Sequence, residues 1–160
     1  MCGNINSSNV VNHVPYDKND IRTAITDSGC TSHYMCEAYH CDNIAPTGQN
    51  ALTVTVPNGQ SIKSSHTATL KWDHLPIKAR KCHIFPHLKN KILLSIGQFC
   101  DAGMTATFTE EILYIYKDNY IVLQGERSTI SGMWYIDLTK YHPQKIEKAQ
   151  RAILLKNVHT

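Results

Sequence analysis

Short runs of β-branched and aromatic residues, separated by turn residues, recur along the chain from Ile21 onwards. Such spacing is typical of an all-β domain, because these side chains pack well on a pleated, half-buried surface. One nearly continuous apolar run, residues 91–97, predicts a strand buried on both faces. The chain has 160 residues, which is enough for one such domain and its core. The sequence therefore predicts an all-β domain over residues 21–138.

The expected strands follow from these runs. They are residues 21–27, 51–56, 61–70, 77–85, 91–97, 105–108, 111–116, 120–123 and 133–138, with a short strand or helical turn and then a loop in residues 31–46. Asn58-Gly59 predicts a hairpin turn, because both residue types tolerate positive φ. Residues 98–103 predict one or two helical turns that end at Gly103.

The two ends of the chain differ from this domain in composition. Residues 1–20 are rich in Asn, Ser and Asp and predict a flexible leader. Residues 139–160 predict a helical tail that starts near Pro143, either a packing helix or the beginning of a further domain. The sequence shows no partner surface for the apolar face of this tail.

Charge and cysteine content narrow the class of protein. The net charge is +3 and the 16 basic residues are spread along the chain, which gives no strong footprint for nucleic acid. Six cysteines without a signal-peptide pattern predict an intracellular protein with reduced thiols. No apolar run approaches the ~20 residues that span a bilayer, so we expect a soluble, cytoplasmic protein without a membrane partner.

Asp27-Ser28-Gly29 is the candidate for chemistry. An apolar run leads into one carboxylate, and a small hydroxyl residue and a glycine follow it. Glycine lets the backbone turn sharply and come close to another chain, so the triplet is a compact way to present an acid. The triplet alone is a weak signal, because the same three residue types are common in ordinary turns.

Several collinear motifs give the triplet more weight. Residues 27–35, 56–60, 83–103, 105–109 and 132–135 resemble, in this order, segments of the retropepsin-like aspartic proteases encoded by copia-type retrotransposon polyproteins. The resemblance covers about residues 24–138, and the combination is far more specific than any single motif.

The resemblance implies a small closed β-barrel of the acid-protease type. The residue pattern adds one short helix after Gly97 and a C-terminal helix to this expected fold. The resemblance also implies an aspartic endopeptidase that cuts its own polyprotein as a homodimer without a cofactor, in the cytoplasm or within virus-like particles. Asp27 of each copy would be catalytic, because two carboxylates that share one proton can activate water. Nucleic acid would be a partner only through the parent polyprotein.

The same resemblance implies supporting roles for residues around Asp27. Ser28 would brace the carboxylate, and Gly29 would let the two loops approach. The hairpin at Pro57, Asn58 and Gly59 would be a flap that closes over an extended peptide, and an ordinary hairpin tip is the alternative. Ile96-Gly97 would pack behind the active-site loop in a structural role.

The sequence offers three alternatives to the aspartic protease. One of them stays open and two are disfavoured. The first is a non-catalytic β-barrel that serves as an interaction module of a degraded or domesticated retroelement protein. The second is zinc-dependent nucleic-acid binding, but the cluster lacks paired Cys-x2-Cys arms and we expect no metal; its residues are Cys30, His33, Cys36, His40 and Cys41. The third, a Ser28-His33-Asp27 triad, is disfavoured because triads are assembled across a fold.

Overall fold

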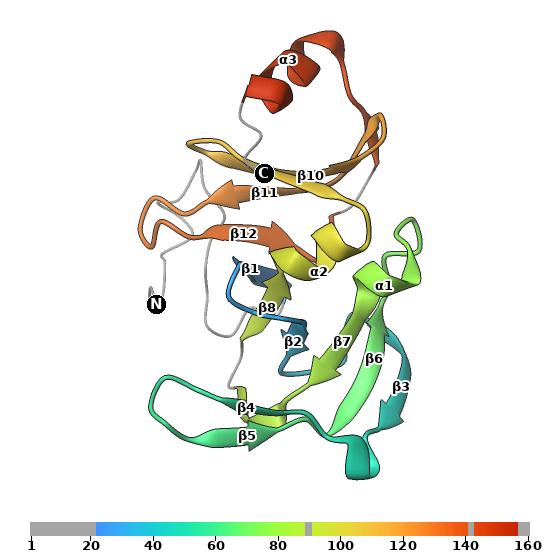
Figure 1. The fold of residues 1–160 in the computed structure, drawn as a ribbon. Helices are drawn as coiled ribbons and strands as arrows, with labels where there is room; N and C mark the ends of the chain where they lie inside the picture. Colours follow the sequence, from blue (N-terminus) through green and yellow to red (C-terminus); the bar gives the residue numbers. More distant parts are fainter. Residues whose placement is uncertain (1–21, 89–90, 141–142, 157–160) are drawn as a thin grey trace.

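The computed structural model describes residues 22–88, 91–140 and 143–156, and these residues form a mostly β structure (Figure 1). The strands are β1 (Thr23–Asp27), β2 (His33–Met35), β3 (Cys41–Pro46), β4 (Thr53–Thr55), β5 (Ser61–Lys63), β6 (His66–Leu70), β7 (Lys81–Ile84), β8 (Ile92–Ser95), β9 (Thr105–Phe108), β10 (Ile112–Lys117), β11 (Tyr120–Arg127), β12 (Trp134–Asp137) and β13 (Gln144–Lys145). The helices are α1 (Ile77–Arg80), α2 (Ile96–Asp101) and α3 (Lys148–Lys156), and 3-10 turns cover Gly48–Asn50 and Pro86–Leu88. The predicted leader, residues 1–20, lies outside the described residues.

One large sheet and one hairpin contain all the strands of the described residues. The large sheet has the order β3-β6-β7-β2-β8-β1-β12-β11-β10-β9, with β13 added to β11, and β4 and β5 form a separate two-stranded sheet. The prediction of a mostly β fold is confirmed. The prediction of a closed barrel is wrong, because β3 and β9 end the path and do not pair in the described part of the chain. Closure requires the first and last strands to pair, and no local sequence pattern reports such a pairing.

The buried strand β8 lies at the centre of the large sheet. It pairs in parallel with β1 and antiparallel with β2, and Leu94 is completely buried. The register places Asp27, the last residue of β1, beside Ser95, the last residue of β8. The two strand ends therefore bring the Asp-Ser-Gly turn next to the start of α2.

Two predicted strands are divided in the structure. Residues 61–70 give β5, which belongs to the hairpin, and β6, which belongs to the large sheet. The division falls at Ser64, whose buried hydroxyl accepts a hydrogen bond from the Leu52 amide at 2.8 Å. Residues 77–85 begin as helix α1, directly after the extended Pro76, and only then form β7. Proline favours the start of a helix because its missing N–H needs no partner there.

Two further boundaries differ from the prediction. Residues 31–46 contain two strands, β2 and β3, instead of one short element and a loop. The strand predicted for residues 91–97 ends at Ser95, because the Ser95 hydroxyl accepts the Gln98 amide at 3.0 Å and caps α2. Helix α2 ends near Gly103, which has φ of 88°, so the predicted helical turns and their glycine stop are confirmed.

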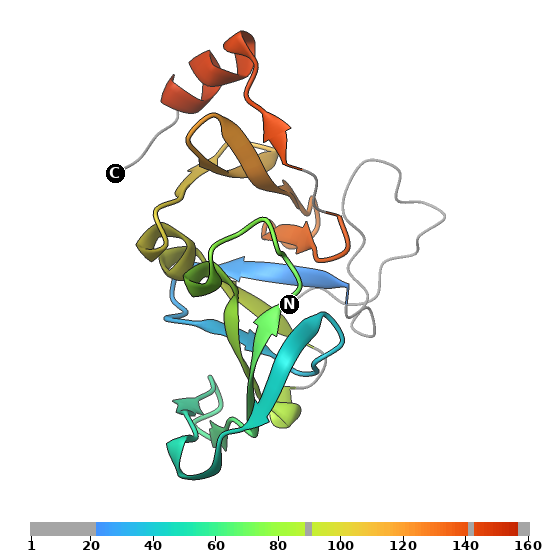
Figure 2. The same ribbon diagram turned by 90° about the vertical axis from the view of Figure 1, so that its right-hand side faces the viewer.

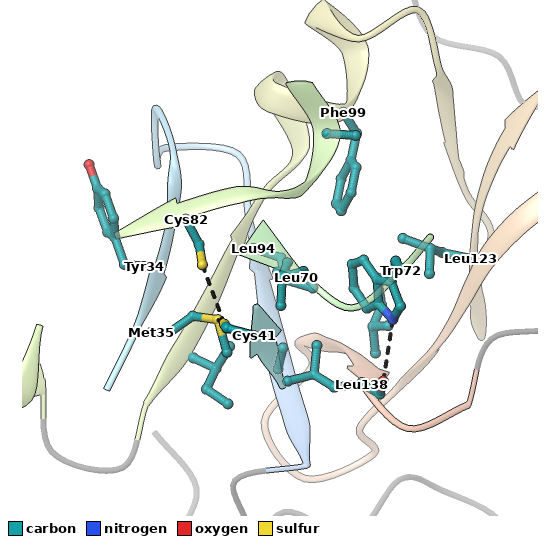
Figure 3. Packing of buried hydrophobic residues seen from close by; sticks show 14 of the residues in the cluster. Tyr34, Met35, Cys41, Leu70, Trp72, Cys82, Leu94, Phe99, Leu123 and Leu138 are labelled. Carbon is teal, nitrogen blue, oxygen red and sulfur yellow. Dashed lines mark hydrogen bonds between the residues drawn. The ribbon is translucent and has the colours of Figure 1, made fainter. Parts of the chain in front are cut away.

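The core is built around large side chains from several strands (Figure 3). Trp72 is 1% exposed, and its indole N–H donates to the Leu138 carbonyl at 3.3 Å. This bond joins the chain after β6 to the chain after β12, two segments that are far apart in sequence. The Phe99 ring of α2 lies 6.3 Å from the Trp72 ring, and Cys41 and Cys82 bring their sulfur atoms to 3.6 Å. The core thus links both ends of the large sheet through α2.

The C-terminal tail packs against the sheet. Strand β13 pairs with β11, and a small apolar cluster joins Ile146 and Leu154 to Ile121. The described helix starts at Lys148, five residues after Pro143, because residues 144–145 are used for pairing. Figures 1 and 2 show α3 at the end of the molecule opposite the β4–β5 hairpin. Among the described residues, no helix is both long and apolar enough to cross a membrane.

Candidate active site

The Asp27 carboxylate is held by donors from its own turn. Its Oδ1 atom accepts the Gly29 amide at 2.7 Å, and its Oδ2 atom accepts the Cys30 thiol at 3.3 Å. A Cβ atom added at Gly29 would lie 3.2 Å from Oδ1, so any other residue here would displace the carboxylate by a few tenths of an ångström. Ser28 is exposed, and its hydroxyl is not among the donors to Asp27 in the described residues. The turn therefore presents one partly exposed carboxylate through Gly29 and Cys30.

Ser95 and Gln98 fix the loop that carries Asp27. The Ser95 hydroxyl donates to the Cys30 carbonyl at 2.7 Å and accepts the Gln98 amide. The Gln98 side-chain oxygen accepts the His33 amide at 2.9 Å, while its nitrogen donates to the Lys78 and Lys81 carbonyls. The loop of residues 27–33 is thus tied to the start of α2 in its middle and at its far end.

The His33 imidazole is a buried structural group. Its Nδ1 atom accepts the Ser95 amide at 2.9 Å, which leaves Nε2 to donate to the Ala79 carbonyl at 2.8 Å. These two bonds require the neutral ring with the proton on Nε2. Burial lowers the pKa of His33 to about 4, with a further decrease from the nearby His83 and an opposing effect of the bond to Ala79. Both ring nitrogens are occupied away from Asp27, so His33 forms no triad with Asp27 and Ser28.

A cleft of about 820 Å³ opens beside Asp27. Its lining residues are Ile25, Asp27, Gly29, Cys30, Thr31, Tyr34, Val54, Thr55, Val56, Pro57, Asn58, Gln60, Ile62, His87, Leu88, Lys91, Leu93 and Met133. These residues come from β1 and the loop that follows it, β2, the β4–β5 hairpin, the 3-10 turn Pro86–Leu88, β8 with the residue before it, and the residue before β12. Among these lining residues, Asp27 is the only carboxylate. The cleft therefore combines one acid with mostly apolar walls.

The β4–β5 hairpin forms one wall of the cleft. Val54 and Ile62 pair across it and line the cleft together with the exposed Thr55, whereas Thr53 is exposed and does not line the cleft. The tip is closed by local bonds: the Gly59 amide donates to the Val56 carbonyl at 2.9 Å, and the Gln60 amide donates to the Asn58 side chain at 2.8 Å. The predicted hairpin is confirmed.

The backbone conformation of the hairpin tip differs from the one expected from the sequence, in which both Asn58 and Gly59 could take positive φ. Gly59 has φ of 86°, whereas Asn58 is not among the described non-glycine residues with positive φ. A three-residue loop with a single left-handed glycine explains this difference. Pro57 and Asn58 line the cleft and Gly59 does not.

Ile96 and Gly97 lie at the start of α2 instead of at a strand end. Ile96 packs against the core, and Gly97 is exposed. The contacts that hold the Asp27 loop come from their neighbours Ser95 and Gln98, which the sequence argument missed. The spacing Ser-x-x-Gln directly after an apolar strand is a helix-start signal and could have drawn attention to both residues.

The cysteines and histidines considered for zinc are separated in the structure. Cys30 lies at the cleft, while Cys41 is buried beside Cys82 and Met35 in the core. The Cys30 thiol also donates a hydrogen bond to Asp27. The sequence did not suggest this bond, because cysteine is a small and mostly apolar residue. In residues 22–88, 91–140 and 143–156, no group of three or more His, Cys, Asp or Glu side chains could hold a metal ion.

No protein-family model, curated protein or solved structure matches the chain. The function proposed below therefore rests on the geometry of the Asp27 cleft and on the motif resemblance in the sequence.

Proposed function

We propose that this chain is an aspartic endopeptidase domain of the retropepsin-like type, similar to those of copia-type retrotransposon polyproteins. The observation that supports it is the position of the Asp27 carboxylate at the end of β1. Two local donors hold this carboxylate, and it lines a mostly apolar cleft of about 820 Å³. A cleft with apolar walls and few polar groups is the usual form of a binding site. A carboxylate in such a cleft is suited to general acid–base chemistry.

One carboxylate is not sufficient for this chemistry, so the proposal includes a second copy of the chain. When two such acids lie a few ångströms apart, they share a single proton, because both cannot ionise together. The ionised acid then takes a proton from water, which attacks the peptide carbonyl, while the protonated acid donates to the developing oxyanion. The tetrahedral intermediate collapses when an acid gives a proton to the amide nitrogen, so that the C–N bond breaks and the amine leaves. In the homodimer, Asp27 of each copy supplies one of the two acids.

The β4–β5 hairpin supports a role as a flap. Val54 and Ile62 line the cleft, and among the described residues the tip is closed by hydrogen bonds within its own turn, those of the Gly59 and Gln60 amides. A cover of this kind can open for an extended peptide and close over it. The substrate class is therefore polypeptide, and the polyprotein that contains the domain is the expected target.

Replacing Asp27 by Asn tests this proposal directly. The full chain is fused to a polypeptide that carries candidate cleavage segments, and the products are followed by mass spectrometry. We expect Asp27→Asn to reduce cleavage by about 10²–10⁴-fold or more, because the amide cannot act as a general base. Asp101→Asn is the matched control, because Asp101 also precedes a small residue and a glycine but lies on α2. Equal cleavage by wild type and Asp27→Asn would contradict the proposal.

A non-catalytic interaction module is the second candidate. The observation that favours it is the open edge of the large sheet, where β3 ends the strand order and Ile44 is 50% exposed. Unpaired edge strands offer backbone groups to another chain. This alternative predicts a stable monomer without cleavage activity at acidic or neutral pH, which light scattering and the fusion assay would detect together.

A further inference from the structure

The Cys30 thiol lies directly against the acid of the proposed active site. Its sulfur atom is 3.3 Å from Asp27 Oδ2, while the Gly29 amide occupies Oδ1. Cys30 lines the cleft and is partly exposed, so it differs from the buried cysteines of the core. The thiol is held in place by its own backbone, because the Cys30 carbonyl accepts the Ser95 hydroxyl at 2.7 Å.

We propose that Cys30 is a positioning residue for the aspartic endopeptidase reaction, and that its thiol fixes the orientation of the Asp27 carboxylate. This inference rests on the proposed function. A carboxylate whose two oxygens each accept a hydrogen bond is restricted in its rotation, which keeps a reacting group near its productive position. The Cys30 thiol can supply one of these bonds without bringing a charge into the cleft.

The protonation state of Cys30 fits this role. Burial, the hydrogen bond to Asp27 and the charge of the Asp27 carboxylate raise the pKa of the Cys30 thiol to about 12. The thiol therefore keeps its proton at neutral and acidic pH and remains a donor.

Several other titratable side chains lie around the cleft, but they are not the hydrogen-bond donors to Asp27. Tyr34, His87 and Lys91 line it, and the Tyr34 hydroxyl lies 3.3 Å from the Thr31 hydroxyl. His33 is buried, and both of its ring nitrogens form hydrogen bonds with backbone groups. Among the described residues, the hydrogen bonds to the Asp27 carboxylate come from Gly29 and Cys30. Cys30 is therefore the side chain whose removal tests this interaction.

The first experiment compares Cys30→Ala with Cys30→Ser in the cleavage assay, with the candidate segments supplied as a separate peptide. Alanine removes the donor, so we expect kcat to fall about tenfold while KM changes by less than about twofold, because a small misplacement of a reacting group is costly. Serine keeps a donor and should restore most of the wild-type kcat. Circular dichroism of each variant checks the fold. If the alanine variant is folded and keeps the wild-type kcat, the proposal is wrong.

A second experiment does not depend on protease activity. The full chain is alkylated with iodoacetamide between pH 7 and 10, and modification of Cys30 is followed by peptide mass spectrometry in wild type and Asp27→Asn. The exposed Cys100 serves as an internal reference in the same molecule. We expect Cys30 to react at least about tenfold faster in Asp27→Asn, because the thiolate forms at lower pH once the carboxylate charge is absent.

The two experiments separate the two possible failures. Equal alkylation of Cys30 in wild type and Asp27→Asn would overturn the interaction, whatever the activity of the protein. Faster alkylation in Asp27→Asn together with a wild type that cleaves nothing would leave the interaction intact and reject the proposed function. Faster alkylation together with a lower kcat of Cys30→Ala is the result that the proposal predicts.

Discussion

The Asp27 loop and the hairpin tip line the same cleft but are held in opposite ways. The loop of residues 27–33 depends on partners that are distant in sequence: Ser95 holds the Cys30 carbonyl, and Gln98 holds the His33 amide. Among the described residues, the hydrogen bonds of the tip, residues 56–60, begin and end within the tip itself, and Val56 at its start packs against the core. Long-range bonds to a buried strand and helix resist local opening, whereas a turn closed by its own bonds can move with its hairpin.

This difference agrees with what the proposed chemistry requires. A catalytic group has to stay within a fraction of an ångström of its productive position, which rigid surroundings provide. A cover over a peptide has to open and close, which favours a segment with few long-range bonds. Substitution of the buried His33 tests how the Asp27 loop is held, and substitution of the left-handed Gly59 tests how the hairpin tip is held.

The largest effect is expected from the protonation of His33. Its pKa in the folded protein is about 4, below the ordinary value of 6.5, so the unfolded chain binds the proton more readily. The stability contributed by the neutral ring is complete above pH 6.5 and is lost as the pH falls towards 4. The shift corresponds to about 3 kcal/mol. Urea denaturation at several pH values measures this loss, and NMR titration of the ring measures the pKa.

A non-titrating variant separates His33 from the carboxylates that also respond to acid. His33→Gln should be less stable than wild type at neutral pH, because its amide replaces two ring bonds imperfectly. The free energy of unfolding of this variant should fall less steeply between pH 6.5 and 4. Equal slopes in both proteins, or an NMR-derived pKa near 6.5, would show that the loop is not held by a neutral His33.

A smaller effect is expected from adding one methyl group to the Asp27 loop and, separately, one to the hairpin tip. Gly29→Ala places a Cβ atom 3.2 Å from Asp27 Oδ1, so the carboxylate has to shift. We expect about tenfold slower cleavage with a change in stability below about 1 kcal/mol, because a small misplacement of a reacting group is costly. Cleavage rates and urea denaturation measure the two quantities.

Gly59→Ala is the matched comparison in the hairpin. Its Cβ atom would meet no other atom within 4 Å, but φ of 86° strains an alanine. The expected cost is about 1 kcal/mol, confined to the tip. Hydrogen exchange should become faster in residues 56–60 and stay unchanged in residues 27–33. Faster exchange in both segments would show that the two parts are coupled and not independent.

Local patterns were sufficient to predict much of the fold. Asn58-Gly59 indicated the hairpin, Gly103 indicated the end of a helix, and the strands at residues 105–108 and 120–123 were expected where β9 and β11 lie. Each of these features depends on the backbone preferences of neighbouring residues. Sequence analysis also identified Asp27 as the acid of the candidate site.

The features that sequence analysis missed depend on distant pairing. The open sheet, the docking of Leu154 against Ile121 and the bond from Ser95 to Cys30 each join segments that are far apart in the chain. The Cys30 thiol was missed for a different reason: a cysteine is usually a small apolar residue, and only its distance to Asp27 gives it a polar role. Predicting these features requires the positions of the strands.

Mixing wild-type chains with Asp27→Asn chains tests most directly whether two copies share one active site. If two Asp27 residues form the site, mixed dimers are inactive, and equal amounts of the two chains leave about one quarter of the activity of the same total amount of wild type. The chains are co-expressed so that they assemble at random, and cleavage of the fusion substrate is measured. A remaining activity of about one half would mean that each chain acts alone, which would contradict the homodimeric site.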